Sequence, residues 1–183
     1  MGPSGSGIST LLQLLGGLDK LTSGQINVGG QDLSRLNDSG LSRYRNHTIG
    51  FIFQSFNLQS HLTSLENVAL PLILGGVSSR AATEEVSGYL DRVHLMDKID
   101  KYPAQLSGGE MQRVAIARAL VRQPTIILAD EPTANLDKEN AENVQLMLLE
   151  IDLHNQAIIV VTHDDRIAAR FEQLVWWEWV IWG

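Results

Sequence analysis

The sequence has 183 residues, of which 44% are hydrophobic and 19% charged, as is ordinary for one globular domain with a buried core. Its net charge of −7 argues against free nucleic acid as a partner of the surface as a whole. The absence of cysteine excludes a disulfide framework and a thiolate zinc site and suits a reducing cytosol, and no apolar stretch approaches the roughly 20 residues that span a bilayer.

A glycine-rich segment opens the chain and matches a phosphate-binding loop at every position but one: Gly2, Pro3, Ser4, Gly5, Ser6, Gly7, Ile8, Ser9 and Thr10. Glycines let backbone N–H groups converge on phosphate oxygens, and a helix predicted over Thr10–Leu15 would add its dipole. Ser9 would bind Mg²⁺, whereas Ile8 stands where a lysine normally reaches the outer phosphates. A helix-capping turn is the alternative interpretation of this segment alone. A buried strand normally precedes such a loop, so we expect that the chain was cut or begins late.

Three apolar runs predict strands that are covered on both faces, as in a parallel sheet: Ile49–Gln54, Thr125–Asp130 and Ala157–Thr162. Helical periodicity between and around them predicts helices over Leu65–Leu74, Thr83–Val93, Gly108–Arg122 and Asp137–Leu153. The stretch 57–106 contains no strand pattern and is predicted to be mostly helical. We therefore expect an α/β core with a mostly parallel sheet, formed by residues 1–56 and 107–183, and an inserted helical subdomain at 57–106.

Polar side chains stand at the ends of the predicted strands. Asp130 and Glu131 close one strand, at the edge of the sheet where α/β proteins bind ligands. Asp130 would hold Mg²⁺ through water, and Glu131 would orient the attacking water. Gln54 and His163 end the other two strands, so the first could ligate Mg²⁺ and the second could contact a terminal phosphate. The simpler alternatives are a solvated acidic turn and two ordinary surface residues.

The segment Leu106-Ser107-Gly108-Gly109-Glu110 precedes a predicted helix. Ser107 and Glu110 have the spacing of a capping box. A capping box does not explain two successive glycines, which weaken a helix but let a phosphate approach its N-terminal backbone. We expect the cap and the phosphate site to be the same structure.

The order and spacing of these motifs resemble the ATP-binding domain of ABC transporters, a P-loop NTPase of the RecA-like type. The resemblance rests on the glycine-rich loop, Gln54, LSGGE at 106–110, ILADEP at 127–132, the Asn135-Leu136-Asp137 segment and His163. It extends to about residue 173. The stretches GGLD at 16–19, LENVALPL at 65–72 and ILADEPTANLD at 127–137 resemble the branch of the lipoprotein-releasing and macrolide-export ATPases and their cell-division relatives.

The resemblance implies a head-to-tail pair of ATPase domains, of the same or of different chains, with each ATP between them. Ser107, Gly108 and Gly109 would then serve the nucleotide on the partner, and Asp137 would lie at the seam. Hydrolysis would use Glu131 and His163, with Mg²⁺ on Ser9, Gln54 and Asp130. The helical segment from about Asn57 would contact transmembrane permease subunits, which places the protein in the cytoplasm, peripheral on the inner face of the plasma membrane.

Three departures from the family pattern lead to further expectations. Replacing the lysine by Ile8 removes a contact worth roughly 1.5–3 kcal/mol, so we expect weak ATP binding and little hydrolysis. Strands expected before the phosphate loop are absent from the sequence, so we expect marginal stability. The tail contains Trp176, Trp177, Trp179 and Trp182, which favours a frame change or an altered edge strand over an interfacial membrane anchor.

Other functions stay open from the sequence alone. Ile8 is compatible with a nucleotide-binding or regulatory module that does not hydrolyse ATP, and the two unusual ends are compatible with a non-functional gene remnant. An ABC ATPase of DNA repair is a further alternative. The short spacing between Gln54 and Ser107 and the lack of cysteine argue against the long coiled-coil or zinc-bearing insert of that class.

Overall fold

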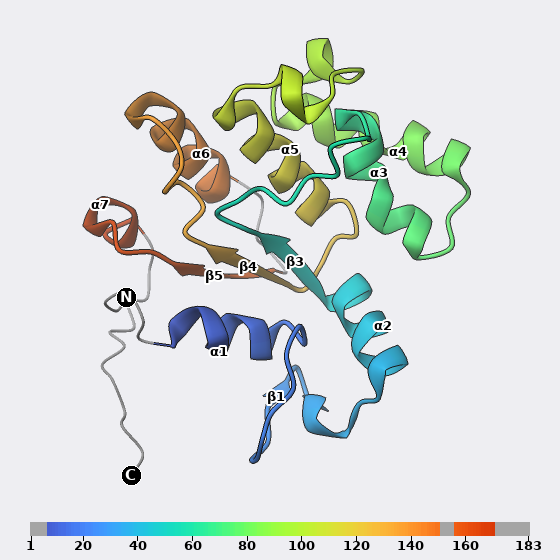
Figure 1. Cartoon of the computed structure of the whole chain (residues 1–183), viewed down its shortest axis with the longest axis vertical. Coiled ribbons are helices and arrows are strands. Elements are labelled where there is room, and N and C mark those ends of the chain that lie inside the picture. Colours follow the sequence, from blue (N-terminus) through green and yellow to red (C-terminus); the bar gives the residue numbers. More distant parts are fainter. Residues whose placement is uncertain (1–6, 151–155, 171–183) are drawn as a thin grey trace.

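The computed structural model describes residues 7–150 and 156–170, and within them a parallel sheet lies between two layers of helices (Figure 1). Its strands β3 (Ile49–Ile52), β4 (Ile126–Asp130) and β5 (Ala157–Val161) lie side by side in that order. Both pairings are parallel, and they place the carboxyl ends of all three strands at one edge of the sheet. The predicted α/β architecture with a parallel sheet is confirmed, although each strand is one or two residues shorter than predicted.

Helices cover both faces of this sheet. The helix α1 (Ile8–Leu15) lies on one face, and α5 (Gly108–Leu120) and α6 (Lys138–Glu150) lie on the other (Figure 1). The strands supply both cores because their side chains alternate: Leu128 packs with α1, whereas Ile127 packs beneath α5. The sheet and α5 approach closely at Gly50, where a Cβ atom would lie 2.5 Å from the carbonyl oxygen of Ala119.

A helical layer lies beyond α5 and is formed by α3 (Ser64–Leu74) and α4 (Ser79–Arg92) with two 3-10 turns, Met96–Lys98 and Pro103–Gln105. Thr63 caps α3 in a complete capping box with Glu66. The helix α4 begins four residues earlier than predicted because the side chain of Ser78 caps it. These elements fall within the predicted insert 57–106, whose boundaries stay a prediction.

Several elements were not predicted. A hairpin forms from β1 (Asn27–Val28) and β2 (Gln31–Asp32), and α2 (Asp38–Thr48) follows a 3-10 turn at Leu33–Arg35. The hairpin strands are too short to show alternation, and its turn uses two glycines with φ of 58° and 85°. The helix α2 buries only Leu41 and Tyr44, so its apolar stripe is narrow. A short helix, α7 (Asp165–Ala168), follows β5.

Two groups of predictions lie outside the described residues. The first comprises the glycine-rich positions Gly2, Pro3, Ser4, Gly5 and Ser6, and the second comprises the four tryptophans of the tail. The remaining loop positions, Gly7 to Thr10, are described. They show that the predicted helix begins at Ile8, two residues before the expected start.

Candidate functional site

The ends of the three strands bring the predicted polar residues to one edge of the sheet. Glu131 follows β4 directly, and Gln54 and His163 each stand two residues beyond β3 and β5. The strand registers set Ile52 opposite Ala129 and Asp130 opposite Val161, so these positions lie at similar heights. Within the described part of the chain the Gln54 side chain makes no hydrogen bond, but its backbone carbonyl accepts a hydrogen bond from Asn135 Nδ2 at 2.9 Å.

Ser9 and Asp130, both predicted to hold a metal ion, meet at this edge although 121 positions separate them. The Ser9 hydroxyl donates to Asp130 Oδ1 at 3.2 Å. Ser9 stands in the first turn of α1, which follows Gly7 with φ of 77° and carries no side-chain cap. Its first backbone N–H groups are therefore available to an anion. A hydroxyl and a carboxylate oxygen side by side suit Mg²⁺, which prefers hard oxygen ligands. The position of the usual lysine is occupied by Ile8, which supplies no charge.

Glu131 and His163 form a close pair. Their Oε1 and Nδ1 atoms are 2.7 Å apart, with 73% of the His163 side chain exposed and 19% of the Glu131 side chain. The hydrogen bond to the Glu131 carboxylate, together with its negative charge, raises the pKa of His163. Glu131 is held in a left-handed conformation with φ of 46°, and its N–H donates to the Val161 carbonyl at 2.9 Å. The pair offers a base and a hydrogen-bond donor to any ligand at this edge.

The start of α5 confirms the predicted capping box. The Ser107 N–H donates to Glu110 Oε2 at 2.8 Å, and the Glu110 N–H donates to the Ser107 hydroxyl at 3.3 Å. The backbone hydrogen bond from Ser107 lowers the pKa of Glu110. The two glycines differ in their surroundings. A Cβ atom on Gly109 would lie 2.1 Å from Asn140 Oδ1, whereas a Cβ atom on Gly108 would meet nothing closer than 3.5 Å.

Asp137 caps α6. Its two carboxylate oxygens accept from the backbone N–H and the side-chain amide of Asn140, at 3.0 and 2.7 Å. The backbone hydrogen bond from Asn140, followed by the side-chain one, lowers the pKa of Asp137. Because Asn140 also abuts Gly109, one side chain connects Asp137 with the beginning of α5.

Two residues that sequence reasoning did not single out also contribute to the site. Gln112 is fully buried in α5 and donates its side-chain amide to the Pro132 carbonyl at 2.6 Å, next to Glu131. Asn135 fixes the Gln54 carbonyl. Gln112 stands next to the apolar stripe of α5. Its burial depends on how α5 packs in the structure, and no sequence pattern indicates it. Asn135 was part of a motif but had no predicted role.

These parts define a class of protein, an α/β nucleotide-binding protein. At one edge of its sheet lie a helix N-terminus with free N–H groups, a hydroxyl and a carboxylate that suit Mg²⁺, and a carboxylate–histidine pair. The profile of the ABC transporter family matches residues 1–134, and the chain belongs to this family. It is an ABC transporter ATP-binding subunit of the branch that contains LolD and MacB. The predicted family, P-loop NTPase fold and ATPase class are confirmed.

Individual relatives support this assignment. The chain is 49% identical over 176 residues to the lipoprotein-releasing system ATP-binding protein LolD of Legionella pneumophila (strain Lens), covering 96% of this chain and 78% of LolD. It is 44% identical over 175 residues to the macrolide export ATP-binding/permease protein MacB of Escherichia coli (strain K12), covering 96% of this chain and 27% of MacB.

A solved structure of the ATP-binding cassette MJ0796, a dimer in a post-hydrolysis state bound to ADP and Pi, superposes with a TM-score of 0.83 at 43% identity. The match covers 92% of this chain and 75% of that one. Among the helices described for the present chain, none has the length and apolar character required to cross a bilayer.

Proposed function

We propose that this chain binds ATP with Mg²⁺ at the carboxyl edge of the sheet and, paired with a second cassette, uses its hydrolysis to drive transport by permease subunits. The convergence of Ser9 with Asp130 and of Glu131 with His163 carries the proposal. Mg²⁺, when bound, would offset the charge on the phosphates. Ser9, Asp130 and Gln54 would hold it.

In this proposal Glu131 polarises the attacking water, because a carboxylate held rigidly next to the metal ligands can accept a proton. His163 would donate a hydrogen bond to the terminal phosphate while Glu131 fixes the orientation of its ring. The first-turn amides of α1 and the glycine-rich segment before it would hold the phosphates. Thr10 and Gly7 belong to the same segment.

Ile8 weakens this site. A charge-assisted hydrogen bond from lysine is worth roughly 1.5–3 kcal/mol, so its loss lowers ATP affinity on the order of 10- to 100-fold. The loss in hydrolysis is larger if charge accumulates on the phosphates in the transition state. A nucleotide-binding module that does not hydrolyse ATP is therefore the second candidate function.

The pair would form around the start of α5. Ser107 is exposed, and its hydroxyl and the neighbouring N–H groups could face a phosphate on the second cassette. Gly109 is buried against Asn140, so only its backbone would take part, whereas Gly108 leaves room for a close approach. Asp137 would lie at the seam between the two cassettes. The dimeric state of the MJ0796 cassette supports the pairing itself.

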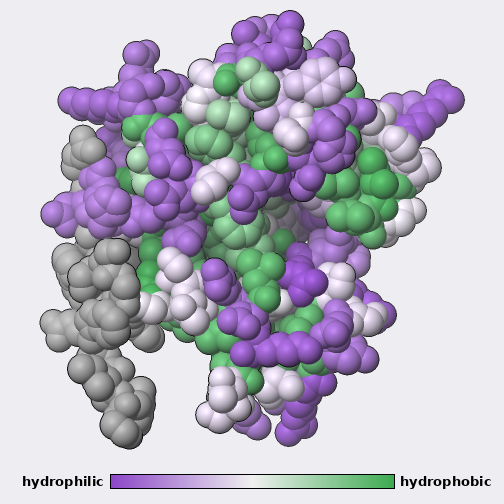
Figure 2. Space-filling view, viewed as in Figure 1, coloured by the Kyte–Doolittle hydropathy of each residue, from purple (hydrophilic) through white to green (hydrophobic). Residues whose placement is uncertain are grey.

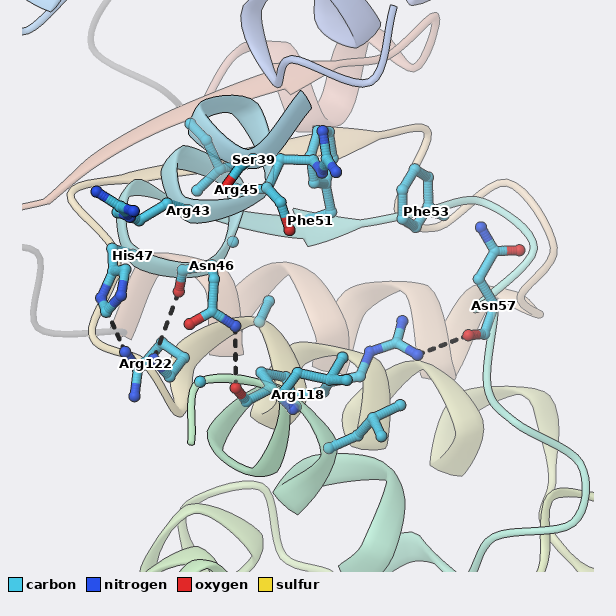
Figure 3. A pocket seen from close by; sticks show the side chains of 18 residues that line it. Ser39, Arg43, Arg45, Asn46, His47, Phe51, Phe53, Asn57, Arg118 and Arg122 are labelled. Atoms are coloured by element: carbon cyan, nitrogen blue, oxygen red, sulfur yellow. Dashed lines mark hydrogen bonds between the residues drawn. The ribbon is translucent and has the colours of Figure 1, made fainter. Parts of the chain in front are cut away.

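A cleft of about 670 Å³ along the outer edge of β3 is the proposed permease contact, and it contains none of the residues assigned to the nucleotide site (Figure 3). Its floor and rim include Leu70, Pro71 and Leu74, and Leu74 is 75% exposed. Figure 2 shows hydrophobic residues grouped at the right-hand edge of the molecule, in the region of α3. Apolar side chains at a rim favour a protein partner.

The charge of the cleft indicates the chemistry of that partner. Four arginines line it and none of its lining residues is acidic, although the chain as a whole carries a net charge of −7. These residues are Arg43, Arg45, Arg118 and Arg122. A permease segment with both apolar and acidic side chains would be complementary. Such an assembly would hold the chain at the inner face of the plasma membrane. Nucleic acid is not among the proposed partners.

Thermal unfolding with and without Mg-ATP tests the function, on this chain and on Ile8→Lys. A ligand that binds only the folded state raises the midpoint, and a 10- to 100-fold gain in affinity corresponds to about 3–11 °C for a chain of this size. We expect a clear Mg-ATP shift for Ile8→Lys and a small one for the parent chain. The absence of a shift in both folded proteins would contradict nucleotide binding. Equal shifts would contradict the role given to position 8.

A further inference from the structure

The loop that follows Gln54 has an unusual backbone. Phe56 and Asn57 are consecutive non-glycine residues with φ of 60° and 50°, a left-handed region that L-residues rarely adopt twice in succession. The turn has internal hydrogen bonds from the Phe56 N–H to the Phe53 carbonyl at 3.1 Å and from the Asn57 N–H to the Ser55 carbonyl at 2.6 Å. A conformation of this kind persists only where the surroundings hold it.

Arg118, near the end of α5, holds this loop from the side. Its Nη2 donates to the Phe56 carbonyl at 2.8 Å, and its Nη1 donates to the Asn57 carbonyl at 2.6 Å. Figure 3 shows the guanidinium directed at the Asn57 backbone. The Gln54 carbonyl is held separately by Asn135. The loop is therefore fixed at one end by the segment after Glu131 and at the other end by α5, the helix that Ser107 caps.

The environment of Arg118 is not that of an ordinary surface cation. Burial lowers the pKa of Arg118 to about 10. No carboxylate among residues 7–150 and 156–170 lies within ion-pair distance of it. Arg118 is partly buried, and a charge withdrawn from water without an opposite charge is costly, so its carbonyl partners are the interactions that favour this position. Both carbonyls belong to the loop that carries Gln54.

We propose that Arg118 is a positioning residue that sets the direction of Gln54 by holding the left-handed turn at Phe56 and Asn57. The proposal rests on the proposed function in one respect, the role of Gln54 as a metal ligand. Because Ser107 and Arg118 stand on the same helix, α5 connects the surface facing the second cassette with the loop that carries a metal ligand of this chain's own site. A movement of α5 would displace both.

Hydrogen exchange of the peptide that covers residues 53–58 tests the positioning without nucleotide. Arg118→Met removes both hydrogen bonds, so we expect amide exchange in this peptide to rise about tenfold or more while α1 and α4 are unchanged. Arg118→Lys keeps the charge but not the forked geometry, so a smaller rise is expected. Arg92→Met, at an exposed arginine of α4, is the control and should leave the loop unchanged.

The outcomes separate positioning from a general structural role. Unchanged exchange in the loop of a folded Arg118→Met or Arg118→Lys protein overturns the proposal, as does a rise of equal size throughout the chain. If Arg118→Met does not fold, Arg118→Lys alone decides, through a local rise in the 53–58 peptide or its absence.

A second experiment measures how the Mg²⁺ requirement of ATP binding depends on Arg118, in proteins that also carry Ile8→Lys. Arg118→Met should raise the Mg²⁺ concentration for half-maximal ATP binding about tenfold, as should Gln54→Ala, and Arg118→Lys should restore part of it. If Gln54→Ala changes nothing, the proposed metal role of Gln54 fails while the exchange result still decides on Arg118. If Gln54→Ala shifts the Mg²⁺ requirement and Arg118→Met does not, the positioning proposal fails.

Discussion

Glu131 lies in a backbone conformation that a carboxylate-bearing residue seldom adopts. Its φ of 46° is left-handed, and such positions cost on the order of 1–3 kcal/mol when no glycine relieves them. The hydrogen bond from its N–H to the Val161 carbonyl binds it to the end of β5, so its carboxylate is directed toward His163. The backbone strain at Glu131 thus accompanies the orientation of the candidate pair Glu131–His163.

The pair predicts a pH dependence. The pKa of His163 is raised above its ordinary value of 6.5 by Glu131, so the pair stabilises the fold fully below the unfolded-state pKa and loses that contribution as pH rises through the raised value. An NMR titration should show the pKa of His163 falling toward 6.5 in Glu131→Gln. Glu139→Gln removes the same charge from an exposed position on α6 and should not move it. An unchanged titration in Glu131→Gln would refute the contact.

At the scale of elements, α3 and α5 begin in the same way but with different surroundings. Both carry a complete capping box, Thr63 with Glu66 and Ser107 with Glu110. The first lies in the helical layer away from the sheet edge, and the second opens the helix that faces the proposed partner. The same local chemistry would therefore serve stability alone in one case and, in the proposed function, stability together with ligand contact in the other.

This pair of caps allows a matched comparison. Thr63→Ala and Ser107→Ala each remove one cap, so each should lower the free energy of unfolding by about 1 kcal/mol in denaturant titrations. Only Ser107→Ala should also reduce ATP-dependent pairing of the Ile8→Lys chain. If both variants impair pairing equally, Ser107 acts through stability and not as a ligand of the partner's nucleotide.

The elements that the sequence revealed are those with a strong periodic signal. β3, β4 and β5 could be predicted from continuous apolar runs, and the polar residues at their ends followed from the geometry of parallel strands. β3 and β4 are largely buried, whereas β5 is more exposed than its apolar run predicts, with Ile159 40% exposed. The hairpin at Gly29 and the helix α2 lack such a signal, since few of their side chains are buried. Contacts such as Arg118 with Phe56, or Gly109 with Asn140, depend on packing between distant segments. No local pattern encodes them.

At the scale of the whole molecule, an acidic chain contains a basic cleft along β3, and the residues of the candidate nucleotide site are not among those that line this cleft. None of the side chains assigned to the nucleotide lines the cleft, but the cleft and the candidate nucleotide site both adjoin the loop after β3. Partner binding and nucleotide binding would therefore use different side chains and would be connected through the backbone of this loop. The proposed pairing of two cassettes would involve the nucleotide site and the start of α5.

Pairing can be measured directly by analytical ultracentrifugation. We expect the Ile8→Lys/Glu131→Gln variant, which restores the lysine and removes the proposed base, to sediment as a dimer with Mg-ATP and as a monomer without it. The parent chain should stay monomeric at the same ATP concentration because its affinity is on the order of 10- to 100-fold lower. A dimer of the parent chain that does not depend on ATP would contradict this mode of assembly.

The helix α5 is capped by Ser107 at its start and contacts the loop after β3 through Arg118 near its end. These two contacts restrict insertions and deletions within the helix. Arg118 stands eleven positions after Ser107 along the chain, about three turns into the helix. One inserted or deleted residue between them would turn Arg118 by about 100° away from the Phe56 and Asn57 carbonyls. A change in the length of α5 would therefore alter the orientation of Arg118 relative to Ser107.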